Sequence, residues 1–204
     1  MNPLIDFPQT PFGSLAFDTI EPAHFMPAAA HWMNVARERI SAITSNTEAP
    51  TFRNTLVPLE FASKELGVVS SCFFNLNSAE TNEDIQSIAR ELSPKLTLFN
   101  NETLLNEALF LRIKTVWENR EEEQLDAESA RLLKETYEGF VRNGALLEGQ
   151  QRESLKSISE KLSKLSLSFG ENVLKETQAF ELHVADAEEL AGLPEATIAS
   201  AASL

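Results

Sequence analysis

The sequence predicts an all-α protein, a multi-helix antiparallel bundle of about six long helices with an extended N-terminal arm. Apolar residues recur at steps of three and four along most of the chain, which is the spacing of one face of a helix. Only seven of the 204 residues are glycine, which is few for the tight turns of an all-β sandwich. The connections between the periodic segments are short, so consecutive helices are expected to pack as antiparallel neighbours.

Residues 1–20 are rich in proline and phenylalanine, which predicts an extended arm laid over the core rather than a helix. The helical bundle is predicted over residues 21–177. Its first helix begins near Pro22, because a proline in the first turn gives up an N–H that needs no partner there. The second begins at Thr51, a good N-cap, and Pro58 is expected to kink it or to move its true start later.

The next two helices are predicted from capping residues and apolar spacing. Thr81 is expected to cap the third helix, with Asp84 capping reciprocally and Pro94 causing a bend. The fourth is expected to run from about Thr103 to the acidic residues at 121–123.

The fifth and sixth helices complete the predicted bundle. Asp126 is expected to cap the fifth, which ends at the pair Asn143-Gly144. The sixth carries apolar residues at steps of three and four, which predicts a buried seam of the bundle. Gly170 interrupts it, and because a mid-helix glycine destabilises a helix by up to ~1 kcal/mol relative to alanine, we expect it to permit close helix packing. The seam consists of Leu155, Ile158, Leu162, Leu165, Phe169 and Val173.

Residues 178–204 are predicted to be the start of a following segment. The run "AFELHV" predicts a short strand at about 180–184, and a capped helical turn, a Gly-Leu-Pro break and another helical start follow it. No helix stop signal precedes Leu204, so the sequence is expected to be truncated inside this segment.

The composition restricts the partners and the location of the protein. With 31 acidic and 17 basic residues the formal charge is −14, which disfavours nucleic acid as a partner. No polybasic segment and no long apolar run point to a membrane. Cys72 is the single cysteine, so an internal disulfide is impossible. The N-terminus lacks the features of a signal peptide, and a cytoplasmic location is expected.

The three histidines do not form a metal-binding motif. His24, His31 and His183 include no pair four residues apart, so no H-E-x-x-H zinc motif occurs. Glu21 precedes His24 by three residues, which is half of a di-iron pattern, but the second half is missing. Glu21 is better explained as favourable negative charge at a helix start. We therefore predict no metal-ligating residue in this chain.

Other candidate chemistry also fails on spacing. The glycines at 139, 144 and 149 lack the Lys-Ser/Thr pair of a phosphate-binding loop. The serines of 154–168 have no histidine at a plausible spacing, and the acidic run at 121–123 is most simply a solvated face. The motifs alone therefore predict no catalytic residue and no cofactor in this chain, and they do not identify substrate-binding residues.

Seven collinear stretches carry a resemblance to a known family. They are "NPLI" at 2–5, "FDTIEPAHFMPA" at 17–28, "PTFRNTLVPLE" at 50–60, "ELSPKLTLFNNETLLNEALFLRIK" at 91–114, "LDAESARLLKETYEGFVRNGALL" at 125–147, "LSLSFGENVLKETQAFELHV" at 165–184 and "ELAGLPE" at 189–195. Together they resemble the N-terminal region of the zinc oligopeptidases, the family of oligopeptidase A, peptidyl-dipeptidase Dcp and thimet oligopeptidase. The resemblance is closest to the Dcp branch. The sequence departs from the family pattern at Ala23, Arg53 and Pro58.

The resemblance implies a function that the motifs do not. In that family the zinc and its H-E-x-x-H motif belong to a downstream catalytic lobe that is absent here. The chain would then be a non-catalytic helical lobe that walls and gates the channel for short peptide substrates, with that downstream lobe of the same polypeptide as its partner. Alone it would be inactive. The residues by themselves also allow a stand-alone helical protein-interaction module without enzymatic activity, and they leave dipeptide removal and internal cleavage undecided.

Overall fold

The computed structural model of the chain describes residues 2–8, 10–184 and 186–202. Over these residues the chain forms helices and no strand, which confirms the all-α prediction. None of the described helices combines the length and the apolar character needed to cross a membrane. The chain divides into two compact units, Met1–Leu167 and Ser168–Leu204, and the boundary falls within helix α7.

The N-terminal unit contains most of the helices. They are the short turns η1 (Pro11–Gly13) and η2 (Phe17–Thr19), helix α1 (Pro22–Thr44), the π-helical turn η3 (Phe52–Leu56), α2 (Val57–Ala62), α3 (Lys64–Ala79), α4 (Glu83–Leu104), α5 (Glu107–Glu118), α6 (Ala127–Arg142) and the first part of α7 (Gly149–Ala179). The C-terminal unit holds the rest of α7, η4 (Ala187–Leu190) and α8 (Glu195–Ala201).

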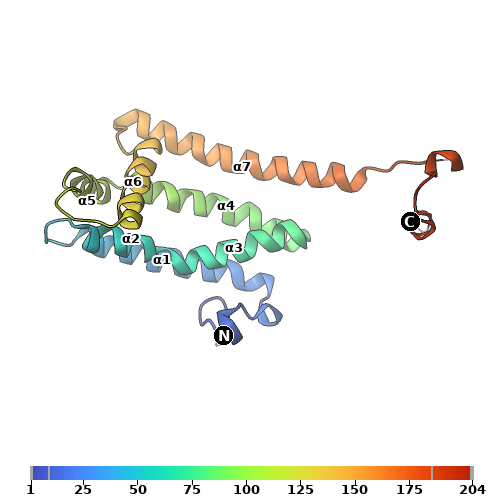
Figure 1. Cartoon of the computed structure of the whole chain (residues 1–204), viewed down its shortest axis with the longest axis horizontal. Coiled ribbons are helices and arrows are strands. Elements are labelled where there is room, and N and C mark those ends of the chain that lie inside the picture. The colour runs from blue at the N-terminus through green and yellow to red at the C-terminus, as the bar shows by residue number, and fades with distance from the viewer. Residues whose placement is uncertain (1, 9, 185, 203–204) are drawn as a thin grey trace. The chain divides into compact units, whose positions relative to one another are not determined.

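Helix α1 is the centre of the N-terminal unit, because it packs against α2, α3, α4 and α5. The chain runs one way along α1, returns along α2 and α3 and reverses again along α4, so these neighbours are antiparallel (Figure 1). Their shared core includes Phe25, Phe73 and Leu92, all almost completely buried. The rings of Phe25 and Phe73 meet edge to face at 5.1 Å, a favourable aromatic geometry.

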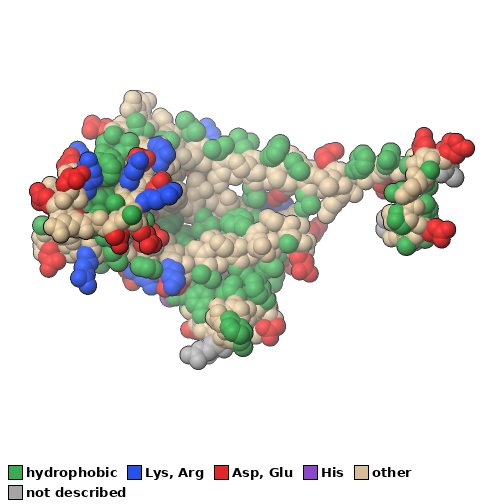
Figure 2. Space-filling model, viewed as in Figure 1, with side chains coloured by type: hydrophobic (Ala, Val, Ile, Leu, Met, Phe, Trp, Pro, Cys, Tyr) green, Lys and Arg blue, Asp and Glu red, His purple; other side chains and the backbone are tan. Residues whose placement is uncertain are grey.

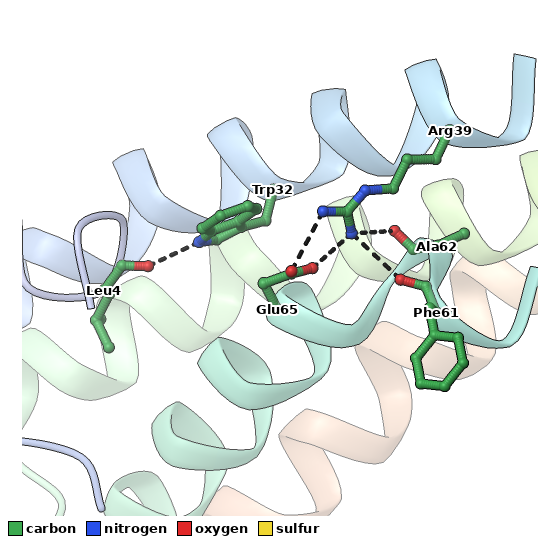
Figure 3. Close-up of polar contacts among 6 residues, drawn as sticks. All are labelled: Leu4, Trp32, Arg39, Phe61, Ala62 and Glu65. Atoms are coloured by element: carbon green, nitrogen blue, oxygen red, sulfur yellow. Dashed lines mark hydrogen bonds and ion pairs between the residues drawn. The ribbon is translucent and has the colours of Figure 1, made fainter. Parts of the chain in front are cut away.

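The N-terminal arm is held on α1 by specific contacts. Leu4 is completely buried, and its carbonyl oxygen accepts a hydrogen bond of 2.7 Å from the indole Nε1 of Trp32 (Figure 3). Asn2 donates from Nδ2 to the carbonyl oxygen of His24 at 2.9 Å. The ring of Phe7 stacks on Trp32 at 5.9 Å. A buried leucine thus anchors the arm at a fixed place along α1.

The second predicted helix is divided differently from the prediction. Thr51 caps it as predicted, because its hydroxyl accepts from the backbone N–H of Asn54. Pro58 lies in the first turn of α2, where its missing N–H removes no helical bond, so the α-helix starts later than Thr51, the second of the two effects predicted for this proline. An unpredicted break falls at Ser63, whose φ of −112° and ψ of 18° are not helical.

Two other predicted boundaries are wrong. Asn82, not Thr81, caps α4, because its Oδ1 accepts from the N–H of Ile85 at 2.9 Å. Helix α4 runs on to Leu104, and α5 begins only at Glu107, capped by Asn106, and ends at Glu118. In both places several residues that can cap a helix stand close together, and tertiary packing selects between them.

The ends of α6 are as predicted. Asp126 accepts from the N–H of Ser129 at 2.8 Å, and this hydrogen bond holds the pKa of its carboxyl below the usual value. The helix stops at Asn143-Gly144, where Gly144 adopts a φ of 90°. The strand predicted at 180–184 does not form, and this segment has no regular structure. A strand needs a partner, and the described residues offer none.

An arginine clamp holds the α2–α3 break against α1 (Figure 3). Nη1 of Arg39, in α1, donates to the carbonyl oxygens of Phe61 and Ala62, both at 3.2 Å. The same guanidinium pairs with both carboxylate oxygens of Glu65, at 2.6 and 3.2 Å. The hydrogen bond from Arg39 lowers the pKa of Glu65. The clamp therefore supplies donors to carbonyls that the end of α2 leaves without regular helical partners.

A second arginine, Arg112 of α5, is buried, with 8% of its surface exposed. Its Nη1 donates to the carbonyl oxygens of Asn46 and Glu48, at 2.7 and 3.2 Å. Its Nη2 donates to Oδ1 of Asn54 at 3.1 Å. These acceptors lie in the connection between α1 and η3 and in η3 itself, so the guanidinium ties α5 to this stretch of backbone.

Gly170 does not have the predicted role. A Cβ atom at this position would meet nothing within 4 Å, so the glycine makes no close helix packing with the part of the chain that the structure describes. Gly144 is the opposite case, because a Cβ there would lie 2.5 Å from Cδ2 of Leu155 and its φ is positive. Close approach in this region therefore occurs at the start of α7 and not at Gly170.

We predict that the stability loss on removing an arginine of the N-terminal unit follows its burial. Arg112→Ala should lower the free energy of unfolding by about 3 kcal/mol, because it removes the three hydrogen bonds of a buried guanidinium and leaves its space unfilled. Arg39→Ala should cost about 1–2 kcal/mol, since its side chain is 38% exposed. Arg37→Ala should cost below about 1 kcal/mol, because its pair with Glu102 is 45% exposed on each side. Urea unfolding of the three variants gives the order of their losses in free energy of unfolding. A larger loss for Arg37→Ala than for Arg112→Ala would contradict the prediction that the loss follows burial.

We also predict opposite effects of alanine at two glycines. Gly170→Ala should increase the stability of α7 by about 0.5–1 kcal/mol, because the methyl group enters open space in a helix. Gly144→Ala should destabilise by more than about 1 kcal/mol, because both the positive φ and Leu155 oppose a Cβ. Amide hydrogen exchange along α7 measures the effect of Gly170→Ala. Urea unfolding measures the loss of stability in Gly144→Ala. A loss of protection in Gly170→Ala would show that the glycine is required after all.

Candidate functional site

The structure places the histidines in local structural roles. Nδ1 of His24 accepts the backbone N–H of Glu21 at 3.0 Å, which fastens the start of α1. The exposed ring of His31 lies edge-on to Trp32 at 4.7 Å. In the C-terminal unit, Nε2 of His183 lies 3.2 Å from a carboxylate oxygen of Glu181. Over the described part of the chain, no three His, Cys, Asp or Glu side chains gather as metal ligands would.

The single cysteine is in no position to act as a nucleophile. Cys72 is buried in the core of the N-terminal unit, with 6% of its surface exposed. Burial raises the pKa of its thiol, so the reactive thiolate is disfavoured. It packs as a small apolar residue, as its surroundings in the sequence predict.

Helix α7 is the candidate functional site, as an interaction surface. It is 31 residues long and none of its residues is buried. Five of the six residues of the predicted seam are between 49% and 71% exposed, and only Leu155, at the start of the helix, is half-buried, so the described residues do not bury this seam. Figure 2 shows hydrophobic side chains at the surface along α7. The exposed set is Ile158, Leu162, Leu165, Phe169 and Val173.

Within the N-terminal unit, α7 is attached by apolar and polar groups: Leu167 is half-buried and packs against the main core, and several hydroxyls and one arginine add hydrogen bonds. The hydroxyl of Ser163 lies 3.0 Å from that of Ser93 and accepts from Thr97 at 2.9 Å, both in α4. Near its start, Nε of Arg152 donates to the carbonyl oxygen of Leu147 at 3.0 Å, and its guanidinium pairs with Glu107. A hollow of about 480 Å³ beside these contacts is lined by serine and threonine hydroxyls together with the apolar side chains of Phe74, Leu162 and Leu167.

This arrangement differs from that of an ordinary bundle helix. A bundle helix buries its apolar face and exposes its polar face. Here Leu167 and the hydroxyl of Ser163 face the rest of the unit, while a second apolar stripe of α7 is in solvent. Burying one such leucine or phenylalanine side chain contributes about 1.5–3 kcal/mol, so covering several of them would stabilise an assembly strongly. A stripe of this kind marks an interface.

The spacing of the stripe indicates that another helix could pack along it. From Leu155 to Phe169 the apolar residues follow steps of 3, 4, 3 and 4, the repeat that lets one helix pack along another. Periodicity therefore located the apolar face correctly. It could not report what covers that face, because the pattern is the same for a buried seam and for an open interface.

Comparison with known proteins finds relatives over nearly the whole chain. The dipeptidyl carboxypeptidase of Salmonella typhimurium is 36% identical over 204 residues, and that of Escherichia coli is 35% identical over 202 residues; each match covers 99% of this chain. Oligopeptidase A of Escherichia coli is 26% identical over 200 residues, or 98% of this chain. The higher identity to the two dipeptidyl carboxypeptidases agrees with the predicted branch. No family model matches the chain.

The matches cover only part of each relative. The chain spans about 30% of the length of these proteins, and the matched part is their N-terminal part. About two thirds of each relative therefore has no counterpart in this sequence.

We predict that the α7 stripe adds little to the stability of this chain by itself. Leu162→Ala and Leu165→Ala should each lower the free energy of unfolding by less than about 1 kcal/mol, because both side chains are already in solvent. Leu92→Ala and Leu109→Ala should each cost about 2–5 kcal/mol, because both are completely buried. Urea unfolding compares the two pairs, and equal losses would mean that the stripe is covered in solution.

Proposed function

Because the chain belongs to the oligopeptidase family of these relatives, as their N-terminal part, we propose that it forms the non-catalytic helical lobe of a zinc-dependent metallopeptidase. The parent enzyme hydrolyses short peptides, and this lobe walls and gates the channel through which they reach the catalytic lobe. The zinc and the catalytic residues lie in the remainder of the polypeptide. The parent is proposed to act in the cytoplasm, consistent with the composition of this chain.

The observation that carries this proposal is the open apolar stripe of α7. A helix with no fully buried residue and with a stripe of five apolar side chains in solvent is poorly explained as a surface that stays exposed to water. It is well explained as the place where further parts of the same polypeptide pack. The named relatives supply a length of chain sufficient for this, since they extend well beyond the matched part.

The second candidate is a stand-alone helical interaction module without enzymatic activity. The same stripe supports it, because an independent partner could also cover α7. The two candidates differ in what restores peptidase activity. Only a lobe of the enzyme would restore peptidase activity when it is joined to the catalytic part of a relative.

The test is a chimera in which this chain replaces the matched N-terminal part of the Escherichia coli dipeptidyl carboxypeptidase. We expect the chimera to release dipeptides from the C-terminus of a short peptide and to lose this activity on treatment with a zinc chelator. The isolated chain should bind no stoichiometric zinc and should hydrolyse no peptide. A folded chimera without activity, or zinc-dependent activity of the isolated chain, would contradict the proposal.

Paired substitutions test the role of α7 within the chimera. Leu162→Ser with Leu165→Ser should reduce activity by about tenfold or more, because two hydroxyls replace leucines that bury against the added lobe. Lys164→Ser is the matched control, since it lies between them and its ammonium only pairs with the exposed Glu160. Circular dichroism of each variant confirms that the helices remain formed.

A further inference from the structure

A second feature of the N-terminal unit lies beside its smaller apolar cluster and takes no part in the proposed lobe contact. A hollow of about 370 Å³ lies where α5, the loop after it and α6 meet, which is within the size range of small-ligand pockets. Its apolar wall is formed by Trp117, Leu125 and Leu133, and polar groups enter from Arg120, Gln124 and Lys134. Apolar walls with a few placed polar groups are typical of binding sites.

The wall of the hollow is held rigid by a stack of rings. The indole of Trp117 lies 5.0 Å from the ring of Tyr137, with only 7° between their planes. Tyr137 stacks in turn on Phe110 at 5.9 Å, and Phe110 on Phe140 at 6.2 Å. On the Trp117 ring, the guanidinium carbon of Arg120 lies 4.4 Å from the ring centroid. The stack therefore fixes both an aromatic surface and a cation at the hollow.

The loop that closes the hollow is conformationally strained. Gln124 has a φ of 48°, in the left-handed region that residues other than glycine rarely adopt. The loop is tied to the unit by Glu123, whose Oε1 accepts the backbone N–H of Phe52 at 3.0 Å. Arg120 also donates from Nη1 to the carbonyl oxygen of Trp117 at 2.8 Å. Strain of this kind, held by surrounding contacts, is frequent at ligand-binding positions.

The charge at the hollow is opposite to that of the chain. The chain carries −14, yet two cations line the hollow, Arg120 and Lys134, against a single carboxylate, Glu121. Figure 2 shows Lys and Arg side chains gathered over the region of α5 and α6. Their ion pairs are long, at 3.7 Å from Arg120 to Glu121 and 3.9 Å from Lys134 to Glu138. Exposed pairs of this length contribute at most about 1 kcal/mol, so a ligand anion can replace them.

We propose that this hollow binds a carboxylate attached to an apolar or aromatic group. The carboxylate would lie between Arg120 and Lys134, and the apolar group would pack on Leu125 and against the edge of the Trp117 ring, since Tyr137 and Arg120 lie against its faces. The C-terminal residue of a peptide has this chemistry, and so does a free aromatic acid. The proposal rests on the geometry of the N-terminal unit and does not depend on the peptidase assignment.

Nuclear magnetic resonance of the whole chain provides the test, because it has only two tryptophans. N-acetyl-phenylalanine should shift the indole N–H resonance of Trp117 in a saturable way. The indole of Trp32, which donates to Leu4, should not move and reports that the fold is intact. N-acetyl-phenylalanine amide, which lacks the carboxylate, should bind at least about tenfold more weakly. Equal binding of acid and amide, or no saturable shift at about 10 mM acid, would overturn the proposal.

Variants and a second acid complete the design. Arg120→Gln and Lys134→Gln should each weaken binding of N-acetyl-phenylalanine by about tenfold. Arg131→Gln is the matched control on α6, because this side chain is 81% exposed and does not line the hollow. If Arg131→Gln weakened binding of N-acetyl-phenylalanine equally, the proposed site would be wrong. The affinity for 3-phenylpropionate, compared with that for N-acetyl-phenylalanine, distinguishes a free aromatic acid from the C-terminal residue of a peptide as the ligand. Equal affinity identifies a free-acid site, and a tenfold preference for the acetylated amino acid identifies a peptide terminus.

Discussion

The buried guanidinium of Arg112 is the constraint on which the N-terminal unit depends. A charge removed from water must find hydrogen-bond acceptors, and here they are two backbone carbonyls and one amide oxygen that follow α1. The bond therefore fixes the register of α5 against the end of α1. That register also places Leu109 and Ile113 in the main core, and Val116 in the smaller cluster with Leu56 and Leu133. One cation thus aligns the helix that joins the two apolar clusters.

Local signals predicted much of the fold and failed where several signals compete. Asp126 and Thr51 each stand alone at a helix start, and both cap as predicted. Thr81 and Asn82 are adjacent caps, and the sequence offers no means of choosing between them. Pro58 lies at the start of α2, one of its two predicted effects, but the break at Ser63 was not predicted, and there the carbonyl oxygens accept hydrogen bonds from Arg39 of another helix. That donor lies more than 20 residues away in the chain, so no local pattern could indicate it.

The site was harder to predict than the fold, for a physical reason. The spacing of Leu162, Leu165 and Phe169 reports that one face of α7 is apolar, and this was read as burial within the bundle. The inner side of the helix is joined instead by Leu167 and by hydroxyls, and the sequence shows those hydroxyls only as serines and threonines of no evident role. The hollow beside Trp117 was missed for a similar reason. Its aromatic rings come from two helices, α5 and α6, which the sequence does not show to be adjacent. The sequence between them is dominated by an acidic run, which does not predict that Arg120 and Lys134 line one hollow.

The exposure of α7 is compatible with a stable helix because its stability is largely local. Lysine and glutamate pairs at i, i+3 and i, i+4, such as Glu160 with Lys164 and Glu153 with Lys156, support the helix without burial. Its length favours it as well, since long helices offset the unfavourable nucleation step better than short ones. A stripe that is already helical loses less conformational freedom when a partner packs on it than a segment that must fold first. An open apolar face on a preformed helix is therefore well suited to forming an interface with the rest of a larger protein, and the same face would be an aggregation liability if it were left uncovered.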